Sequence, residues 1–547
     1  MGPGAADILD GLNESQKEAV MTIDGPLLVV AGPGTGKTLT MVRRIAYLVH
    51  QGVRPENILA VTFTNRAARE MKERTGALLG TRAGNIFIGT FHLLGLRIIR
   101  EARGNDLVIY SRDEQIEALK SLMKSSSKQA RQAGERISRI KNFLVTDNPP
   151  WEQAEVRGCD DIQALYTAYQ SAMRERNAFD FDDLVLTPID ILQHDPSNSF
   201  RNRFTHIIVD EYQDINPAQY WFMKLLVKGT NDICAVGDPD QAIYAFRGAD
   251  IGNFLRFQTD FPGAKRVILS ENYRSTGTIL SAAGSLIANN RARIDKEVLA
   301  TREQGCGIPV LSVPDERSEG DAIVEEIEAR IGGTSHDQMR KSGRARDFSR
   351  RSCQFSDFAV IFRTNAQAKA LEEAFSASGI PYQVIGRKTG AQAKEIKETM
   401  AYLRSFLHGD GDGSPAASDD LETKLVAPAD LFDPRADAVA LMTMHMAKGL
   451  EFPIVFIAGC EDGLVPCTIM KDGADIEEER RLFYVGMTRA KDELFLLSSR
   501  KRFLYGQRHE QAPSPFLREI PDKLIGQRAV PERIRKQKEP DPQMGLF

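Results

Sequence analysis

One glycine-rich segment, AGPGTGKT at residues 31–38, constrains the fold of this chain more than any other part of its sequence. It follows a short apolar run, Leu27–Ala31. It precedes a stretch in which apolar residues recur at helical spacing as far as Val49, with Gly52 as a stop signal. A glycine-rich loop between a strand and a helix is the context that a phosphate-binding P-loop requires. The sequence therefore predicts an α/β fold with a nucleotide site at this loop.

The residue types of the loop have chemical reasons. Glycines let backbone N–H groups close around phosphate oxygens, and the N-terminus of the following helix adds a favourable dipole. We expect Lys37 to reach the β- and γ-phosphates and the Thr38 hydroxyl to hold Mg²⁺. Ala31 replaces the first glycine of the strict pattern. The predicted ATP-binding residues of the loop are Ala31, Gly32, Pro33, Gly34, Thr35, Gly36, Lys37 and Thr38.

A P-loop needs an acidic partner, and IIVDEYQD at residues 207–214 supplies one. An apolar strand ends there in Asp210 and Glu211. We expect Asp210 to coordinate Mg²⁺, and Glu211 to orient and deprotonate the attacking water. The segment alone would be interpreted as a solvated acidic turn. Together with Lys37 and Thr38 it indicates nucleotide hydrolysis.

Length and composition limit the protein class. With 547 residues, of which 42% are hydrophobic, the chain is long enough for about three to four domains. Its six cysteines form no Cys-x-x-Cys pair, which favours unpaired thiols in a reducing compartment. No apolar run reaches the length of a membrane span, and the N-terminus lacks a signal pattern. We therefore expect a cytoplasmic protein without a membrane segment.

The net charge of −4 is acidic for a nucleic-acid-binding chain. Any contact with DNA is therefore expected to be a local groove on an acidic body. Residues from about 94 to 202 are charged and helical, which predicts a helical insertion. Strand signals resume at residues 204–209 and 233–236. A second strand–helix alternation is predicted from Val267, with strands at 358–362 and 454–458.

Further motifs occur in order along nearly the whole chain. They are LNESQKEAV at 12–20, AVTFTNRAAREM at 60–71, GTFH at 89–92, VGDPDQAIYAFRGA at 236–249, ENYRS at 271–275, LMTMHMAKGLEF at 441–452 and EEERRLFYVGMTRAK at 477–491. With the P-loop and the acidic strand end, this set resembles superfamily-one DNA helicases of the UvrD/Rep/PcrA group. The resemblance implies two RecA-like P-loop lobes, each a parallel sheet flanked by helices, with a helical insertion in the first.

The domains implied are a first RecA-like ATP-binding lobe at 1–93 and 203–264, and the insertion at 94–202. A second RecA-like lobe follows at 265–505, with a shortened insertion near 404–436, and then a C-terminal extension and tail at 506–547. The implied activity is ATP-dependent translocation on single-stranded DNA and duplex unwinding, in the 3′ to 5′ direction, with ATP and Mg²⁺ as cofactors.

The resemblance also assigns roles to single residues. Gln241 resembles a γ-phosphate sensor, and Arg274 and Arg489 resemble two arginines that the second lobe supplies to the phosphoryl group. Gln16 is implied to read the adenine, Tyr273 to stack on it and Glu451 to bind the ribose. From spacing alone, Gln16 also fits a helix capping box with Asn13. Lone arginines are more often ordinary surface residues.

Aromatic faces for bases and polar contacts to the backbone are what a sequence-independent single-strand site needs. Candidates follow strand ends, where open α/β sheets place ligands. They are Phe63, Thr64, Asn65, His92, Tyr244, Phe246 and Arg247, with Phe181 of the insertion as a weaker one. An isolated aromatic residue is more often a core residue. Tyr244 and Phe246, however, come directly after Gln241, so a change of nucleotide state could move them.

The chain departs from the family pattern in four places. Phe246 stands where a tryptophan is usual, and Leu39 where an arginine follows the P-loop threonine. RKTGAQA, before EIK at 395–397, replaces an aromatic–acidic–basic pattern. Between Leu403 and Asp437 the chain is too short for the helical domain that the family inserts there. The motor is therefore expected either to unwind constitutively as a monomer or to translocate and need a partner to hold duplex.

The last five residues, Gln543–Phe547, read QMGLF and resemble the peptide by which bacterial proteins dock on the sliding clamp. An ordinary apolar chain end is the alternative. Other hypotheses for the whole chain are a non-hydrolysing scaffold, the motor subunit of a helicase–nuclease, and an RNA-directed enzyme. The expected partners remain single-stranded DNA and its junctions with duplex. The loops at 331–352 and 409–420 carry no assigned role.

Overall fold

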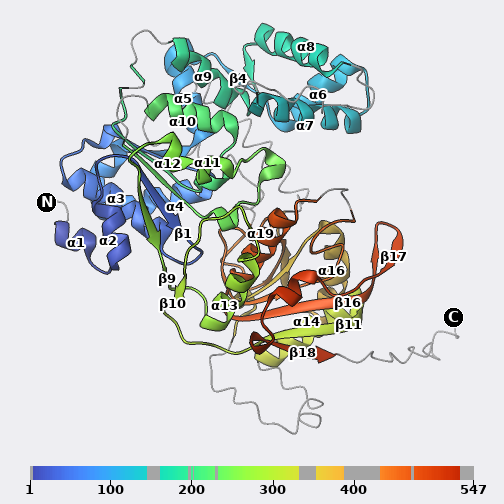
Figure 1. Cartoon of the computed structure of the whole chain (residues 1–547). Coiled ribbons are helices and arrows are strands. Elements are labelled where there is room, and N and C mark those ends of the chain that lie inside the picture. The colour runs from blue at the N-terminus through green and yellow to red at the C-terminus, as the bar shows by residue number, and fades with distance from the viewer. Residues whose placement is uncertain are drawn as a thin grey trace. The chain divides into compact units, whose positions relative to one another are not determined.

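A computed structural model describes residues 4–143, 161–194, 199–200, 202–227, 232–331, 353–386, 432–469 and 474–529. The described residues form two compact units (Figure 1). The first contains residues up to Arg274 together with Arg291–Thr301, and the second contains Ser275–Asn290 and the described residues from Arg302 onward. Among these residues no helix combines the length and apolarity needed to cross a bilayer.

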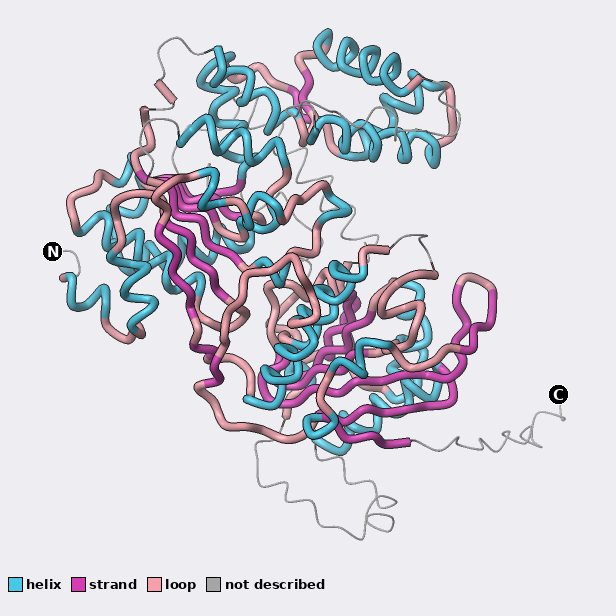
Figure 2. The backbone as a smooth tube through the Cα atoms, in the orientation of Figure 1, coloured by secondary structure: helices cyan, strands magenta, loops and turns pink. Residues whose placement is uncertain are grey.

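The first unit is built on a parallel six-stranded sheet of order β3-β2-β6-β7-β1-β8 (Figure 2). Its strands are β1 (Leu27–Ala31), β2 (Ile58–Thr62), β3 (Phe87–Thr90), β6 (His206–Val209), β7 (Ile233–Gly237) and β8 (Lys265–Leu269). The central strands are short apolar runs buried on both faces, as expected for a parallel sheet covered by helices. The strand predicted at Leu27–Ala31 is confirmed residue for residue.

Two apolar cores lie on opposite faces of this sheet, because alternate residues of each strand point to opposite sides. In β1, Leu28 and Val30 belong to one core, whereas Leu27, Val29 and Ala31 belong to the other. The second of these cores packs against α1 (Ala5–Leu9), α2 (Glu14–Met21), α3 (Lys37–His50) and α4 (Asn65–Leu79). The first packs against α5 (Phe91–Arg103), α9 (Asp183–His194), α10 (Pro217–Val227), α11 (Gly252–Leu255) and α12 (Phe257–Asp260).

The helical insertion has a core of its own, formed by α6 (Arg112–Met123), α7 (Ser127–Phe143) and α8 (Ile162–Glu175). Two short parallel strands, β4 (Val108–Ile109) and β5 (Ala178–Phe179), join its two ends. The independent part is therefore smaller than the predicted 94–202. Most of α5 and all of α9 fall in that range, but both helices pack on the first sheet, because their apolar faces complete its core.

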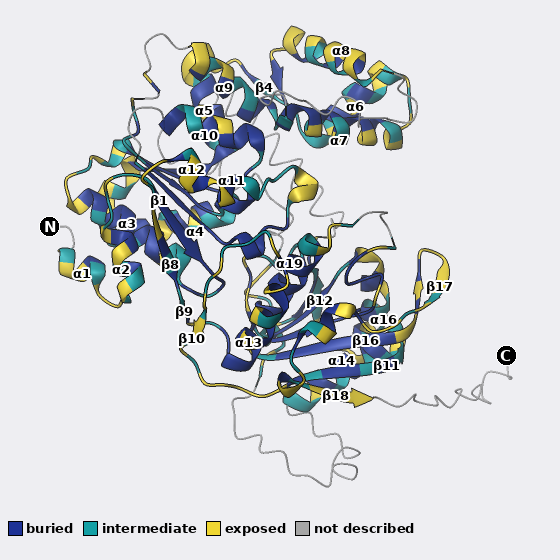
Figure 3. Ribbon diagram, in the orientation of Figure 1, coloured by how far each residue is buried: buried dark blue, intermediate teal, exposed yellow. Residues whose placement is uncertain are grey.

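The second unit contains a sheet of order β13-β14-β12-β15-β16-β11-β18, parallel throughout except that β17 pairs antiparallel with β16. Its strands are β11 (Ile308–Asp315), β12 (Phe358–Phe362), β13 (Tyr382–Val384), β14 (Val439–Thr443), β15 (Phe452–Ile457), β16 (Ala490–Leu504), β17 (Gln507–Glu510) and β18 (Ile525–Ala529). Helices α14 (Glu316–Ile331) and α16 (Ala368–Ser378) pack into one buried core with it. Helices α13 (Gly277–Ile287) and α19 (Ile476–Met487) pack against each other and β16. Figure 3 shows the strands of both sheets as mostly buried.

Two predicted boundaries differ from the division of the structure into two compact units. The first lobe was expected to end at residue 264, but β8 pairs along its whole length with β1, so residues 265–274 belong to the first unit. The range 506–547 was expected to be an extension, but β18 pairs with β11 and forms an edge of the second sheet. In both cases backbone pairing over a long sequence separation decides the boundary.

Some predictions lie outside the described residues. They are the shortened insertion up to residue 431, the RKTGAQA segment, the loops at 332–352 and 409–420, and the clamp-binding peptide Gln543–Phe547.

Candidate nucleotide and nucleic-acid site

The parallel strands of the first sheet end at one edge, and most of the predicted site residues gather there. The P-loop follows β1, Phe63 follows β2 and His92 follows β3 by two residues. Asp210 and Glu211 come directly after β6. The strand order places β6 and β7 between β2 and β1, so both acidic residues lie at the centre of this edge.

The P-loop has the backbone geometry of a phosphate cradle. Gly34 and Gly36 adopt the left-handed φ values of 69° and 80°, which favour glycine. Gly36 is the N-cap of α3, whose 14 residues begin with Lys37. The Thr35 hydroxyl donates to the Gly32 carbonyl at 2.8 Å and braces the turn. The first amides of α3 therefore point into the loop, where an anion would be stabilised.

Both the oxygen and the nitrogen of the Gln16 side-chain amide form hydrogen bonds. Its Oε1 accepts from the Asn13 backbone N–H at 3.1 Å, while Asn13 Oδ1 accepts from the Gln16 N–H at 2.8 Å. This is the capping box that the spacing allowed. Its Nε2 donates to the Thr35 carbonyl at 3.0 Å, and the side chain is only 2% exposed. Gln16 is thus both a helix cap and a brace for the P-loop.

The segment after β8 is also fixed to the P-loop. The Asn272 side chain donates to the Pro33 carbonyl at 2.5 Å, and the Tyr273 N–H donates to the Gly34 carbonyl at 2.9 Å. A Cβ on Gly34 would lie 2.5 Å from the Cβ of Arg274, so only glycine fits there. Arg274 was expected to come from the second lobe. The structure instead places it in the first unit, because these bonds hold its backbone on the P-loop.

Lys37 Nζ lies 3.3 Å from Glu211 Oε1, and the two side chains are 14% and 23% exposed. Glu211 has φ 49° and ψ 43°, a left-handed conformation that is uncommon outside glycine and clusters at functional sites. Its N–H donates to Asp210 Oδ1 at 2.9 Å, and its carbonyl accepts from the Asp214 N–H at 2.8 Å. The structure therefore brings the P-loop lysine and the predicted general base together.

A chain of hydrogen bonds leads from Glu211 to Gln241. Gln213 donates to Glu211 Oε2 and accepts from the Asp238 N–H at 3.0 Å. Asp238 Oδ2 in turn accepts from the Gln241 side chain at 2.7 Å. No role is predicted from the sequence for Gln213, Asp238 or Asn272. Their signal was weak, since single Gln, Asp and Asn residues beside a motif have many structural uses.

The residues present fit Mg²⁺ and ATP. Mg²⁺ is usually held by one or two carboxylates together with substrate phosphates, so Thr38 and Asp210 suffice on the protein side. No cluster of three or more metal-binding side chains occurs among the described residues, so the structure offers no all-protein metal cage there. Leu39, where the family has arginine, is 37% exposed at the start of α3.

Three predicted aromatic residues meet in the first unit. The rings of Phe63 and Tyr244 stack with centroids 5.2 Å apart and an interplanar angle of 18°. Phe246 lies 6.0 Å from Tyr244 and is 60% exposed. The Arg247 guanidinium lies 5.2 Å and 5.5 Å from the centroids of Tyr244 and Phe246. These four side chains form a cationic aromatic surface of the kind that holds single-stranded bases.

The other predicted DNA contacts have local roles as well. Thr64 is the N-cap of α4, and its hydroxyl accepts from the Ala67 N–H at 3.2 Å, with Asn65 as the first residue of the helix. The rings of His92 and Phe181 meet edge to face at 6.2 Å. Burial lowers the pKa of His92 to about 4, so its imidazole is neutral near pH 7. A DNA contact by His92 would therefore use stacking or a neutral hydrogen bond.

Arg489 and Glu451 lie in the second unit. The Arg489 guanidinium is 2% exposed and donates to the carbonyls of Val485 and Leu450, at 2.9 Å and 3.1 Å, and to the Thr488 hydroxyl at 3.1 Å. Glu451 pairs with Lys491 at 2.7 Å. Within its own unit, Arg489 is therefore held by backbone carbonyls on both sides of its guanidinium.

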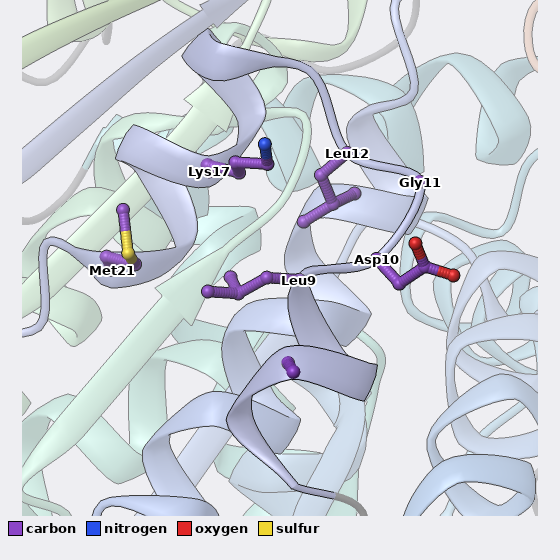
Figure 4. A pocket seen from close by; sticks show the side chains of 7 residues that line it. Leu9, Asp10, Gly11, Leu12, Lys17 and Met21 are labelled. Atoms are coloured by element: carbon purple, nitrogen blue, oxygen red, sulfur yellow. The ribbon is translucent and has the colours of Figure 1, made fainter.

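A pocket between α1 and α2 contains none of the predicted site residues (Figure 4). Its lining includes Leu9, Asp10, Leu12, Lys17 and Met21. Lys17 forms an ion pair with Glu14 of its own helix at 2.9 Å. Gln16 lies on the same helix, but it bonds to the P-loop and does not line the pocket.

Comparison with known proteins gives consistent matches. The model of the UvrD/REP helicase N-terminal domain matches residues 12–262, and that of the UvrD-like helicase C-terminal domain matches residues 267–412 and 423–501. The chain is 32% identical over 655 residues to the ATP-dependent DNA helicase PcrA of Staphylococcus epidermidis (strain ATCC 12228), with 95% of this chain and 87% of that protein covered. For the PcrA of Staphylococcus aureus (strain Mu50), the identity is 31% over 654 residues, with the same coverage. Both alignments are longer than this chain of 547 residues, so these relatives contain segments without a counterpart here.

Proposed function

The chain belongs to the UvrD/REP helicase family, and we propose that it is an ATP-dependent DNA helicase that moves 3′ to 5′ along single-stranded DNA. The observation that carries the proposal lies in the first unit. There the P-loop, the acidic pair and an exposed aromatic surface are built on one sheet and joined through Gln241.

ATP binding and hydrolysis use residues that follow the strands of the first sheet. Lys37 and the first amides of α3 bind the β- and γ-phosphates, and Thr38 and Asp210 would hold Mg²⁺, which would neutralise phosphate charge. Glu211 orients the attacking water and accepts its proton. When bound, ATP supplies the γ-phosphoryl group that is transferred to water, and this hydrolysis drives movement. The neutralisation of charge on that group is assigned to Arg274 and Arg489.

The base and ribose of ATP are assigned to three further residues. Gln16, bonded to the Thr35 carbonyl, is beside the P-loop and in position to read the adenine edge. Tyr273 is 47% exposed, and its hydroxyl accepts from Asn13 and donates to Glu271, which leaves its ring face for stacking. Glu451 is assigned to the ribose from the family motif alone.

We assign the contacts with single-stranded DNA to Phe63, Thr64, Asn65, His92, Tyr244, Phe246 and Arg247. Tyr244 follows Gln241 by three residues, through a backbone whose Gln241 N–H donates to the Asp238 carbonyl at 2.9 Å. A shift of Gln241 toward the γ-phosphate is therefore transmitted to the aromatic surface. Alternating grip and release of bases, coupled to hydrolysis, produces directional movement.

The shorter chain suggests a reduced motor. The PcrA alignments exceed its length, which supports the absence of most of the insertion domain of the second lobe. We assign the protein to DNA repair or replication in the cytoplasm, as a monomer that acts at junctions of single-stranded and duplex DNA. Docking of Gln543–Phe547 on a sliding clamp would recruit it there. The alternative within this function is a translocase that unwinds only with a partner.

ATP hydrolysis with and without single-stranded DNA tests the proposal. The expected result is hydrolysis that depends on Mg²⁺, rises with added DNA and disappears in Lys37→Ala. Hydrolysis that DNA does not stimulate would reject the motor and favour a scaffold. Stronger stimulation by RNA than by DNA of equal length would reassign the substrate.

A further inference from the structure

A buried lysine lies beneath the loop that carries Gln241. Lys296 Nζ is 2.6 Å from Asp238 Oδ1 and 2.5 Å from Asp240 Oδ2. The side chains of Lys296 and Asp240 are each 1% exposed, and that of Asp238 is fully buried. Arg293 adds a contact of 3.2 Å to Asp240, so two cations face two carboxylates.

Asp238 is shared between the lysine and the sensor. Its Oδ1 accepts from Lys296, and its Oδ2 accepts from the Gln241 side chain at 2.7 Å. Its N–H donates to Gln213, which also bonds to Glu211. The position of Lys296 therefore affects Gln241, the predicted γ-phosphate sensor. Through Gln213 it also affects Glu211, the predicted general base.

The same segment also touches the P-loop. A Cβ on Gly32 would lie 3.2 Å from Val298 Cγ2 and 3.7 Å from Lys296 Cε. β10 (Leu299–Ala300) continues the segment by pairing with β9 (Glu271–Asn272), and Asn272 holds the Pro33 carbonyl. Residues 291–301 therefore line the site beneath both the P-loop and the Gln241 loop.

Charge burial argues for a positional role. Buried ion pairs of this kind contribute little net stability, since the cost of removing the charges from water offsets their attraction. Burial disfavours the charge on Lys296, but the two carboxylates outweigh it and raise its pKa. The directional bonds of the cluster restrict Asp238 to one orientation.

The backbone on both sides of residues 291–301 continues into the second unit. Residues 291–301 belong to the first unit, whereas the residues on both sides, Ser275–Asn290 and those from Arg302, belong to the second. The lysine therefore sits on a short span whose two ends continue into the other unit. A displacement of that unit would be transmitted along the backbone to the Gln241 loop.

We propose that Lys296 is a positioning residue for hydrolysis, which holds Gln241 toward the γ-phosphate through Asp238. The inference rests on the proposed function, because it assumes that Gln241 senses ATP. Lys296 itself touches no substrate in this mechanism. Its loss should therefore reduce kcat while leaving the P-loop contacts that determine ATP binding.

The test uses Lys296→Met and the charge-balanced Lys296→Met/Asp240→Asn. The single variant leaves one uncompensated buried carboxylate and should lower thermal stability. The double variant restores the charge balance of the cluster, with one carboxylate and one guanidinium, and should recover part of that stability. At saturating single-stranded DNA, we expect kcat of the double variant to fall by about 10- to 100-fold, a range typical of small misplacements in a site. We expect KM for ATP to change by less than about threefold.

Lys141→Met is the matched control. Lys141 is fully buried and bonds to Asp180 and Asp183 at 2.7 Å each, but it lies in the helical insertion. The Lys141→Met variant should lose stability as Lys296→Met does, but it should keep the wild-type kcat at saturating DNA. Wild-type kcat in the double variant, or recovery of kcat together with stability, would overturn the positioning role. Absence of DNA-stimulated hydrolysis in the wild-type protein would instead reject the proposed function.

Discussion

In this structure, Lys37 of the P-loop is paired with Glu211, with 3.3 Å between Nζ and Oε1. In the proposed mechanism, Lys37 binds the phosphates and Glu211 orients the attacking water, so two side chains of opposite charge act on the γ-phosphoryl group. We therefore expect the phosphates of ATP to compete with Glu211 for the Lys37 ammonium group.

Glu211→Gln should separate binding from hydrolysis. The variant loses the proton acceptor, so kcat should fall by about 10²- to 10⁴-fold. It also removes the charge that competes for Lys37, so ATP should bind at least as tightly as in the wild type. Steady-state hydrolysis and titration with a fluorescent ATP analogue measure the two effects. Weaker nucleotide binding in Glu211→Gln would contradict the competition.

Gln16→Glu should separate the helix cap from the P-loop brace. A glutamate keeps the acceptor that bonds to the Asn13 N–H, so the capping box is retained. It lacks the Nε2 donor and faces the Thr35 carbonyl with an oxygen, so KM for ATP should rise. Gln16→Ala loses both side-chain hydrogen bonds and should also unfold at lower temperature, because the lost capping-box bond contributes about 0.5–1.5 kcal/mol. An unchanged KM in Gln16→Glu would mean that Gln16 serves only the helix.

Phe246→Ala should weaken binding of single-stranded DNA without changing stability, because the ring is 60% exposed. Loss of one base stack, worth about 1–3 kcal/mol, corresponds to about 5- to 150-fold in Kd. Phe246→Trp should bind at least as tightly as the wild type. Trp221→Ala, an exposed aromatic on α10 at 41%, is the control and should bind normally. Anisotropy of a labelled oligonucleotide provides the measurement, and equal affinity in Phe246→Ala would remove this ring from the DNA surface.

His92 should make the protein sensitive to acid. Burial lowers its folded pKa to about 4, below the unfolded value of about 6.5, so the folded state prefers the neutral ring. The stability that this preference gives is full above pH 6.5 and is lost as pH falls from 6.5 toward 4. Between pH 8 and pH 5 the loss amounts to about 2 kcal/mol by linkage. Denaturant unfolding of wild type and His92→Gln at both pH values should show this extra loss only in the wild type, and parallel losses would contradict it.

Local pattern predicted much of the ATP site. The strand at Leu27–Ala31, the helix after Lys37 and the strand before Asp210 each depend on a few adjacent residues, and all three lie where the sequence placed them. Apolar runs bounded by glycine or acidic residues carry this information within a short window. The rings of Tyr244 and Phe246, both predicted to contact DNA, lie with their centroids 6.0 Å apart.

Long-range pairing was not predictable in the same way. Nothing near Lys265 shows that β8 joins β1, and this pairing moves Arg274 into the first unit. Lys296 meets Asp238 across 58 residues, and its surroundings, KEVLAT, would equally suit an exposed loop. The double use of Gln16 likewise depends on the fold of the P-loop, since spacing alone could not distinguish a cap from a ligand contact.

Strand displacement tests the central claim most directly. Duplexes with a 3′ or a 5′ single-stranded tail are mixed with the protein and ATP, hydrolysis is recorded in the same tubes, and Lys37→Ala is the control. The expected result is unwinding from the 3′ tail alone, together with DNA-stimulated hydrolysis that Lys37→Ala lacks. Stimulated hydrolysis without unwinding would indicate a translocase that needs a partner. Unwinding from the 5′ tail, or hydrolysis that ignores DNA, would contradict a 3′ to 5′ helicase.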